Sequence, residues 1–322
     1  RKLLDLSMGF GAMLAGHLNP IVVEEVQTAL NQGMLFVTPS PTSTDAAERI
    51  CKRFGIDQVR FTNSGTESTM YAVRVARSAT GKMGILKVEG GYHGSYDPFV
   101  VSAKPPLNLA GDAEDPTPYI EPNLVPGDIY VIPYNNIDAL EAMFEKNAKK
   151  IACFIVEPVL ENLAIILPDT GYLEGVRALC DKYKILWIAD EVMAGFGRTG
   201  KWFGFQHSAA TPDLITFAKG VTSGYIPLGG VVISGDVAKT FDETVFPGGL
   251  TYMGHPLATA TAVATIQVMK EEKMVENAAT IGEKILGPGL HEMAKKHKLI
   301  GDIRGMGVFW GVDLVTDRAT RA

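Results

Sequence analysis

Two oppositely charged side chains each follow directly after an apolar run. Asp190 comes after ILWIA, and Lys219 comes after LITFA, at the start of the glycine-rich segment GVTSGYIPLGG. A desolvated carboxylate is costly unless a cation meets it. A structural salt bridge between the two residues, or a helix cap made by Asp190, would account for the pattern. The functional interpretation is that Asp190 holds a cationic ring nitrogen, while Lys219 is a nucleophile whose pKa is lowered by desolvation.

The segment NSGTES, residues 63–68, follows an expected strand and opens an expected helix. Free backbone N–H groups and the helix dipole converge at such a position. Ser64 and Glu67 fit an S-x-x-E capping box, which explains the motif without any ligand. Gly65 would let a ligand approach the backbone, and the hydroxyls of Ser64 and Thr66 favour a phosphate site. The motif lacks the lysine of a P-loop.

Two more motifs follow expected strands. GGYHGSYD, residues 90–97, offers Tyr92 or His93 as a flat face for an aromatic ligand, although a turn with a half-buried aromatic ring explains the motif equally simply. Glu157, in IVEPV, is either a buried structural acid or a polar residue beside a site. Together these candidates require a ligand with a phosphate, a flat ring, a cationic ring nitrogen and an aldehyde. Pyridoxal 5′-phosphate meets all four requirements.

Apolar runs and amphipathic segments alternate along the chain. The expected strands are 58–62, 84–89, 151–156, 185–189, 214–218 and 230–234, and the expected helices are 65–79, 137–149, 170–183 and 255–272. This alternation predicts an α/β fold with a mostly parallel sheet. Because ligands of such sheets bind beyond the carboxyl ends of the strands, the candidate residues above lie where a site is expected.

The expected organisation has three parts. Residues 1–38 form an N-terminal segment, 39–275 a large cofactor-binding domain, and 276–322 the start of a smaller α+β C-terminal domain that contains one strand-like run, IRGMGVFWGVDLV. Both ends are expected to be incomplete. The proline-rich stretch 95–135 is expected to be a surface excursion without regular structure, near the site.

Composition excludes several classes of partner. The net charge of −6 and pI near 5.6 argue against nucleic acid and anionic membranes. No apolar stretch approaches the roughly 20 residues of a membrane span, and there is no signal-peptide pattern. The three cysteines are widely spaced, which indicates a cytoplasmic protein without disulfides. The scattered histidines predict no metal site.

The chain resembles the class III, or omega-type, aminotransferases among the fold-type I pyridoxal-phosphate enzymes. The resemblance runs over essentially the whole sequence, and its most specific part is 187–230. It is carried by NSGTES, GGYHGSYD, IVEP, WIADEVMAGFGRTGKWFGFQ, PDLITFAKGVTSGYIPLGG and GLTYMGHPLA.

The resemblance implies roles for the residues at the reacting end of the cofactor. Lys219 would bind the cofactor aldehyde covalently and later shuttle protons, and Asp190 would keep the pyridine nitrogen protonated. Thr251, in GLTYMGHP, would reach the phosphate in the neighbouring subunit. That role implies a homodimer with shared active sites.

The resemblance also implies how the rest of the cofactor is held. Gly65 and Thr66 would bind the phosphate through backbone N–H groups, with Ser64 beside them. Tyr92 would stack on one face of the ring, and Val192 would pack on the other.

The substrate interpretation stays open between two reaction types. The expected activity is transfer of an amino group from an ω-amino acid or amine to an oxo acid, with pyruvate as acceptor; the alternative is an enzyme similar to glutamate-1-semialdehyde 2,1-aminomutase. Members that act on ornithine or aminobutyrate carry Gly-Glu where this chain has Glu161 and Asn162, and Asn162 is more similar to the aminomutases and amine:pyruvate transaminases. GFGRTGKWFGF and GLTYMGHP favour the omega-transaminases. A catalytically idle member is a third hypothesis, against which the intact Lys219 and Asp190 count.

Overall fold

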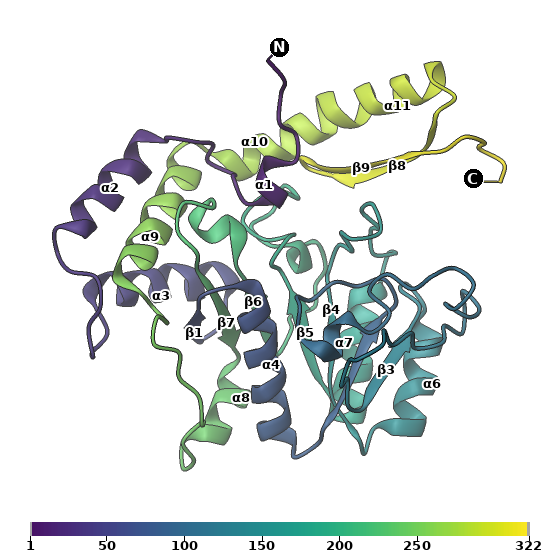
Figure 1. Ribbon diagram of the computed structural model, residues 1–322, viewed down its shortest axis with the longest axis horizontal. Coiled ribbons are helices and arrows are strands. Elements are labelled where there is room, and N and C mark those ends of the chain that lie inside the picture. Colours follow the sequence, from purple (N-terminus) through teal and green to yellow (C-terminus); the bar gives the residue numbers. More distant parts are fainter. Residues whose placement is uncertain (1, 321–322) are drawn as a thin grey trace.

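A computed structural model describes residues 2–320, and its centre is a seven-stranded sheet in the order β1-β7-β6-β5-β4-β2-β3 (Figure 1). β7 is antiparallel to both of its neighbours, and the other four pairs in the sheet are parallel. The predicted α/β fold with a mostly parallel sheet is therefore confirmed. The strands are β1 (Gln58–Thr62), β2 (Gly84–Val88), β3 (Ile129–Ile132), β4 (Ile151–Val156), β5 (Leu186–Asp190), β6 (Leu214–Phe217) and β7 (Gly229–Ile233).

The central strands are apolar along their whole length because both faces of the sheet are covered. All six residues of β4 are buried. Phe154 belongs to the core on one face, with Phe144 and Val176 from helices α6 and α7, whereas Ile155 belongs to the core on the other face, with Val73 from helix α4. A strand buried on both sides needs side chains of this kind at every position.

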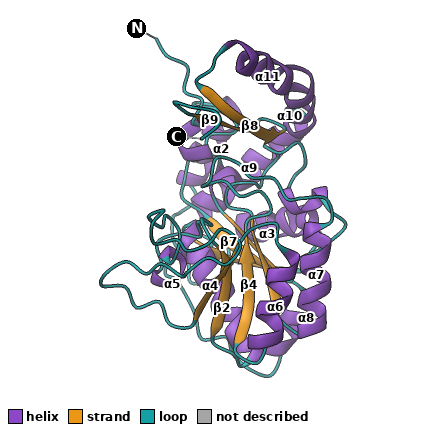
Figure 2. Cartoon of the chain, turned by 90° about the vertical axis from the view of Figure 1, so that its right-hand side faces the viewer, coloured by secondary structure: helices purple, strands orange, loops and turns teal. Residues whose placement is uncertain are grey.

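Helices flank the sheet on both sides (Figures 1 and 2). They are α1 (Met8–Gly11), α2 (Pro20–Leu30), α3 (Pro41–Phe54), α4 (Gly65–Thr80), α5 (Asp97–Val100), α6 (Ile137–Asn147), α7 (Tyr172–Tyr183), α8 (Gly235–Ala238), α9 (Pro256–Glu271), α10 (Met274–Ile281) and α11 (Gly287–Lys296). Short 3₁₀ turns occupy Gly204–His207, Lys219–Thr222 and Lys239–Phe241, and one π-helical turn, Gly282–Leu286, joins α10 to α11.

A separate two-stranded sheet lies on the side of the molecule to which the parallel strands point (Figure 1). It consists of β8 (Ile300–Met306) and β9 (Phe309–Leu314), which pair antiparallel. The sequence predicted one strand-like run here. Gly307, with φ of 57°, makes the tight turn that divides this run into two strands. The predicted boundaries at 38/39 and 275/276 stay predictions.

Other elements differ from expectation as well. The stretch 95–135 was expected to lack regular structure, but it contains α5 and β3, and β3 adds an edge strand beside β2. Helices α2 and α3 were not predicted, although each begins with a cap residue followed by proline, Asn19-Pro20 and Ser40-Pro41. The predicted strands and helices that do form match their observed bounds to within two residues.

Residues 2–320 contain neither a membrane-spanning helix nor a cluster of side chains that could hold a metal ion. No helix within 2–320 is both long and apolar enough to cross a membrane. In the same part of the chain, no cluster of three or more His, Cys, Asp or Glu side chains could hold a metal ion.

Candidate active site

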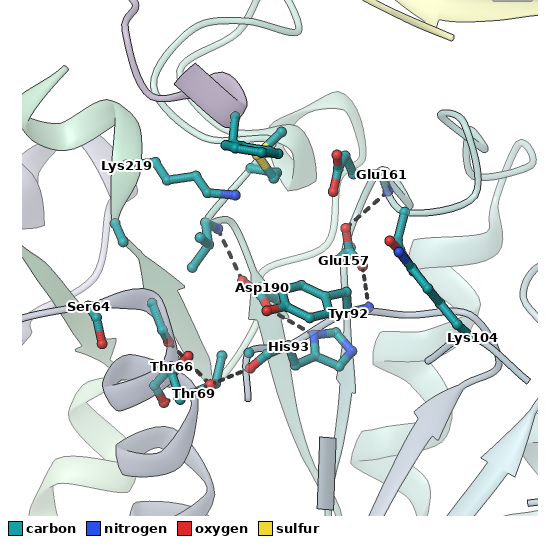
Figure 3. Close-up of a pocket in the computed structure, with 17 residues that line it drawn as sticks. Ser64, Thr66, Thr69, Tyr92, His93, Lys104, Glu157, Glu161, Asp190 and Lys219 are labelled. Atoms are coloured by element: carbon teal, nitrogen blue, oxygen red, sulfur yellow. Dashed lines mark hydrogen bonds and ion pairs between the residues drawn. The ribbon is translucent and has the colours of Figure 1, made fainter. Parts of the chain in front are cut away.

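Asp190 is the last residue of β5 and lies at the bottom of a cavity of about 590 Å³ (Figure 3). Its carboxylate is only 3% exposed. Oδ1 accepts hydrogen bonds from the Val192 N–H at 3.1 Å and the Thr216 hydroxyl at 3.0 Å, and Oδ2 lies 2.8 Å from Nδ1 of His93. The contact with Val192 closes a turn, because residues 192–199 form turns and no helix begins at Asp190. The helix cap considered from the sequence is therefore not formed, and none of these three contacts supplies a strong cation.

His93 is buried directly behind this carboxylate, between Asp190 and the core (Figure 3). Burial lowers the pKa of His93, although the hydrogen bond to Asp190 opposes that effect. The neutral ring therefore donates its Nδ1–H to Asp190, which leaves Nε2 buried with no hydrogen-bond partner among the described residues. His93 orients the carboxylate of Asp190. The two residues are 97 positions apart, so their spacing in the sequence could not indicate this contact.

Lys219 lies two positions after β6 and points into the same cavity (Figure 3). No ion pair connects it to Asp190 or to any other described residue, so the structural salt bridge considered from the sequence is not formed. Desolvation lowers the pKa of Lys219, and the negative charges of Glu161 and Asp190 oppose that shift. Its φ of 44° is a backbone conformation that a non-glycine residue rarely adopts. This combination of strain and desolvation is typical of a functional lysine.

The N-terminus of α4 forms one end of the cavity, where Ser64, Gly65 and Thr66 line the wall. Ser64 caps the helix through a 3.2 Å bond from the Glu67 N–H, while Glu67 accepts from the N–H of the residue before Ser64 at 2.7 Å. The capping interpretation is therefore confirmed. A Cβ on Gly65 would lie 3.0 Å from Cγ1 of Val192, so a larger residue here would require the Val192 side chain to shift by a few tenths of an ångström.

Tyr92 and Glu157 complete the wall opposite α4. The Tyr92 side chain is 44% exposed and extends over the cavity near Asp190 (Figure 3). Glu157 is buried and accepts backbone hydrogen bonds from Tyr92 and Glu161, both at 3.0 Å. Burial, together with the charge of Asp190, raises the pKa of Glu157 to about 8. Glu157 is thus a largely neutral acid at pH 7 that ties two wall segments together.

Nine of the ten predicted site residues line this one cavity, and Thr251 does not. Thr251 lies in a second cavity of about 800 Å³, among residues 35–44 and 250–256. A residue that acts on a neighbouring subunit is not expected to line the cavity of its own subunit, so this placement leaves the prediction for Thr251 untested.

Several residues that line the cavity were not predicted from the sequence, and most of them lie in loops. In the sequence, Glu161 and Asn162 indicated only a substrate class. Lys104 and Phe10 belong to no recognised motif. The residues not predicted as part of the site are Phe10, Thr69, Gly94, Lys104, Glu161, Asn162, Met193 and Ala218. Only Gly94, Met193 and Ala218 had a usable signal, since each adjoins a residue that was predicted.

The cavity fits pyridoxal 5′-phosphate. A buried carboxylate without a charged partner lies at its bottom, a desolvated amine faces it, and a capped helix N-terminus with two hydroxyls lies at one end. These groups suit the pyridine nitrogen, the aldehyde and the phosphate, respectively.

Comparisons with known proteins agree with this geometry. The family model described as "Aminotransferase class-III" matches residues 1–322. A glutamate-1-semialdehyde 2,1-aminomutase of Anaeromyxobacter sp. (strain Fw109-5) is 36% identical, and a 5-aminovalerate aminotransferase DavT of Pseudomonas aeruginosa is 35% identical; each alignment covers 98% of this chain and 74% or 75% of the relative.

A solved structure extends the comparison to three dimensions. The taurine:2-oxoglutarate aminotransferase from Bifidobacterium kashiwanohense, in complex with PLP and glutamate, matches with a TM-score of 0.87 and 32% identity, over 100% of this chain and 75% of that one. The chain thus spans about three quarters of the length of these relatives. The predicted cofactor and the predicted family are confirmed.

Proposed function

The chain belongs to the class-III aminotransferases, and from that premise we propose that it moves an amino group from an ω-amino acid or amine to an oxo acid, with pyruvate as the acceptor. The supporting observation is that Lys219 and Asp190 face one cavity without forming an ion pair. The names of two relatives support the donor class, because 5-aminovalerate and taurine both carry their amino group at the end of a chain.

The reacting groups of the proposal are Lys219 and Asp190. When bound, pyridoxal phosphate supplies an aldehyde that combines with amines and a ring that withdraws electrons. Asp190 holds the protonated ring nitrogen, and His93 keeps the carboxylate in place. Nζ of Lys219 would bind the aldehyde and, as a free amine, would move a proton at the donor carbon. Its lowered pKa increases the neutral fraction that this step requires.

The other wall residues hold and orient the cofactor. Ser64, Gly65 and Thr66 bind the phosphate at the N-terminus of α4, where N–H groups and the helix dipole favour an anion. Tyr92 covers one face of the ring and Val192 the other. Glu157 contributes polar contact at the ring edge while it ties the wall segments together.

A homodimer with shared sites is part of the proposal. Thr251 lies outside the site cavity, in a region where apolar side chains are exposed, including Phe36, Val37 and Tyr252. A second copy that covers this region would bring Thr251 to its partner's phosphate. Light scattering should report a dimer, and Thr251→Ala should weaken phosphate binding; a monomer with full activity would contradict this part. The cytoplasmic location stays a prediction.

The central experiment is Lys219→Ala. The wild-type protein, incubated with pyridoxal phosphate, should absorb as a lysine-bound cofactor, and borohydride should fix the cofactor to Lys219, as detected by peptide mass. Lys219→Ala should bind the cofactor without this linkage and lose amino transfer. Lys104→Ala, which alters another cavity lysine, is the matched control for the borohydride reaction and should still be labelled at Lys219. A wild type that stays colourless would refute the proposal.

The aminomutase is the second candidate, and the 36% identity to such an enzyme supports it. Glutamate-1-semialdehyde should be converted to 5-aminolevulinate without any added oxo acid if this candidate is right. Transfer that depends strictly on pyruvate, measured with 5-aminovalerate and simple amines as donors, would favour the aminotransferase instead.

A further inference from the structure

Glu161 brings a carboxylate to the open side of the site cavity that the proposed mechanism does not use. Its backbone N–H donates to Glu157 at 3.0 Å, but its side chain has no hydrogen bond or ion pair to any of residues 2–320. In Figure 3 the carboxylate points into the cavity, on the side away from Ser64 and Thr66, where the phosphate would lie. A carboxylate that lines a cavity and has no hydrogen-bond partner can accept hydrogen bonds from a ligand.

The loop that carries Glu161 is held firmly. The side-chain amide of Asn162 donates to the carbonyls of Gly90 and Ala103, both at 3.1 Å. Ala164 and Ile165, with φ of 59° and 62°, turn the chain away, and the guanidinium of Arg304 in β8 donates to both of their carbonyls. The position of Glu161 is therefore fixed by its neighbours, and replacing its carboxylate leaves these contacts intact.

Cations around Glu161 are either used elsewhere or kept apart from it. Lys219 is the amine that binds the cofactor in the proposed function, which removes it as a counter-ion. Arg198 is buried behind the N-terminal segment, donates to the Gly11 carbonyl and makes no ion pair with Glu161, although the charge of Glu161 partly opposes the lowering of the Arg198 pKa by burial. Lys104 lines the cavity and is exposed to solvent, without an ion pair to Glu161. A loaded site therefore presents one unpaired negative charge where the far end of a donor would lie.

We propose that Glu161 determines substrate specificity by binding a second, distal ammonium group, so that α,ω-diamines are the preferred amino donors. This inference rests on the proposed aminotransferase function and narrows its donor class. A distal ammonium gains a charge-assisted hydrogen bond to Glu161 that a methyl group cannot make, which corresponds to a preference of about tenfold or more. A distal carboxylate meets a like charge and is disfavoured.

The test compares three donors of equal length: 1,5-diaminopentane, 1-aminopentane and 5-aminopentanoate. The wild type should use the diamine with a kcat/KM about tenfold above that of the monoamine. Glu161→Gln, which keeps the shape and removes the charge, should bring this ratio close to one and improve the amino acid several-fold. Glu161→Asp, which retains the charge, should keep part of the preference. Equal melting temperatures and cofactor spectra establish that the variants are folded and loaded.

Calorimetric titration of the same three compounds into the protein loaded with pyridoxamine phosphate, which cannot accept an amino group, gives a second readout that does not depend on turnover. The diamine should bind the wild type about tenfold more tightly than it binds Glu161→Gln, while the monoamine should bind both alike. If no donor is converted by the wild type, the proposed function fails, and the titration alone decides the role of Glu161. An unchanged diamine-to-monoamine ratio in Glu161→Gln, in affinity or in kcat/KM, would overturn the inference.

Discussion

Asp190→Asn tests the central electrostatic contact, because it removes one charge and keeps the shape. The carboxylate is 3% exposed and accepts from Val192, Thr216 and a neutral His93. In the loaded protein, where Lys219 would be bound to the aldehyde, the ring nitrogen of the cofactor would supply its counter-charge. An opposite charge at hydrogen-bonding distance shifts a pKa by about 1–3 units, and each unit is worth about 1.4 kcal/mol. The pKa of the bound ring nitrogen should fall by that amount in Asp190→Asn.

The loss of ring protonation should slow amino transfer by about 10-fold to 1,000-fold, since proton removal from the donor carbon requires an electron-withdrawing ring. Stopped-flow absorbance of the half-reaction with one amine measures the rate, and a pH titration of the bound cofactor measures the shift. Thr216→Val is the matched control. It deletes one hydroxyl hydrogen bond to the same charged carboxylate, worth about 1.5–3 kcal/mol, but keeps the negative charge, so it should slow transfer less and shift the pKa of the bound ring nitrogen less than Asp190→Asn does.

Stability should respond to Asp190→Asn in opposite directions with and without cofactor. A buried charge without a counter-ion destabilises the cofactor-free protein, so its free energy of unfolding should stay equal or rise in the variant. If cofactor binding weakens about 100-fold, the stabilisation by saturating cofactor should fall by about 2.7 kcal/mol. A variant with wild-type transfer rate and an unchanged cofactor titration would refute the proposed role of Asp190.

Three further predictions concern the frame around the site. The pKa of Glu157 is about 8 in the folded protein, against an ordinary value of 4.5, so the native state holds an extra proton between pH 4.5 and 8. The free energy of unfolding should therefore fall as the pH rises through this window. Urea titrations of Glu157→Gln should show that slope reduced by up to about 1.4 kcal/mol per pH unit. Lys87 is fully buried in β2, and desolvation lowers its pKa to about 7 from 10.5. The unfolded state therefore binds the extra proton between pH 7 and 10.5, and the free energy of unfolding should rise with pH in that window. Lys87→Met should flatten this rise. Arg304→Met removes the hydrogen-bond donors to the carbonyls of Ala164 and Ile165, which hold the loop that carries Glu161. It should lower kcat/KM about 3-fold to 10-fold while the absorbance of the bound cofactor stays unchanged. An equal loss of cofactor binding would contradict the role of Arg304 in holding this loop.

The sequence predicted the sheet well because its strands are buried on both faces. β4 and β6 have no polar face to interrupt the apolar run, and a charged residue directly after such a run marks the strand end. β3 was missed because it has only four residues and lies between Pro126 and Pro133 in an irregular stretch. The hairpin of β8 and β9 was taken for one strand because the glycine turn that divides it lies within a mostly apolar run.

The site was predictable where its residues follow strands and unpredictable where they come from loops. Lys219, Asp190 and Glu157 each lie at the carboxyl end of a parallel strand, so topology alone brings them together. Glu161 reaches the same cavity through a loop, and Phe10 reaches it from the short helix α1; the positions of both depend on contacts far away in the chain. Glu161, for example, depends on a loop whose carbonyls are bound by Arg304, about 140 positions later in the chain.

The charges of the cavity show why these loops matter. Asp190, Lys219 and Glu161 line one space, yet among residues 2–320 no ion pair joins any two of them. Across a low-dielectric cavity the ammonium of Lys219 attracts both carboxylates, and an ion pair with either one would be electrostatically favourable. His93 holds Asp190, the strained backbone at position 219 directs the lysine, and the loop held by Arg304 fixes Glu161. The surrounding structure therefore keeps these groups apart, and the interactions that they do not make with each other remain available to a cofactor and its substrate.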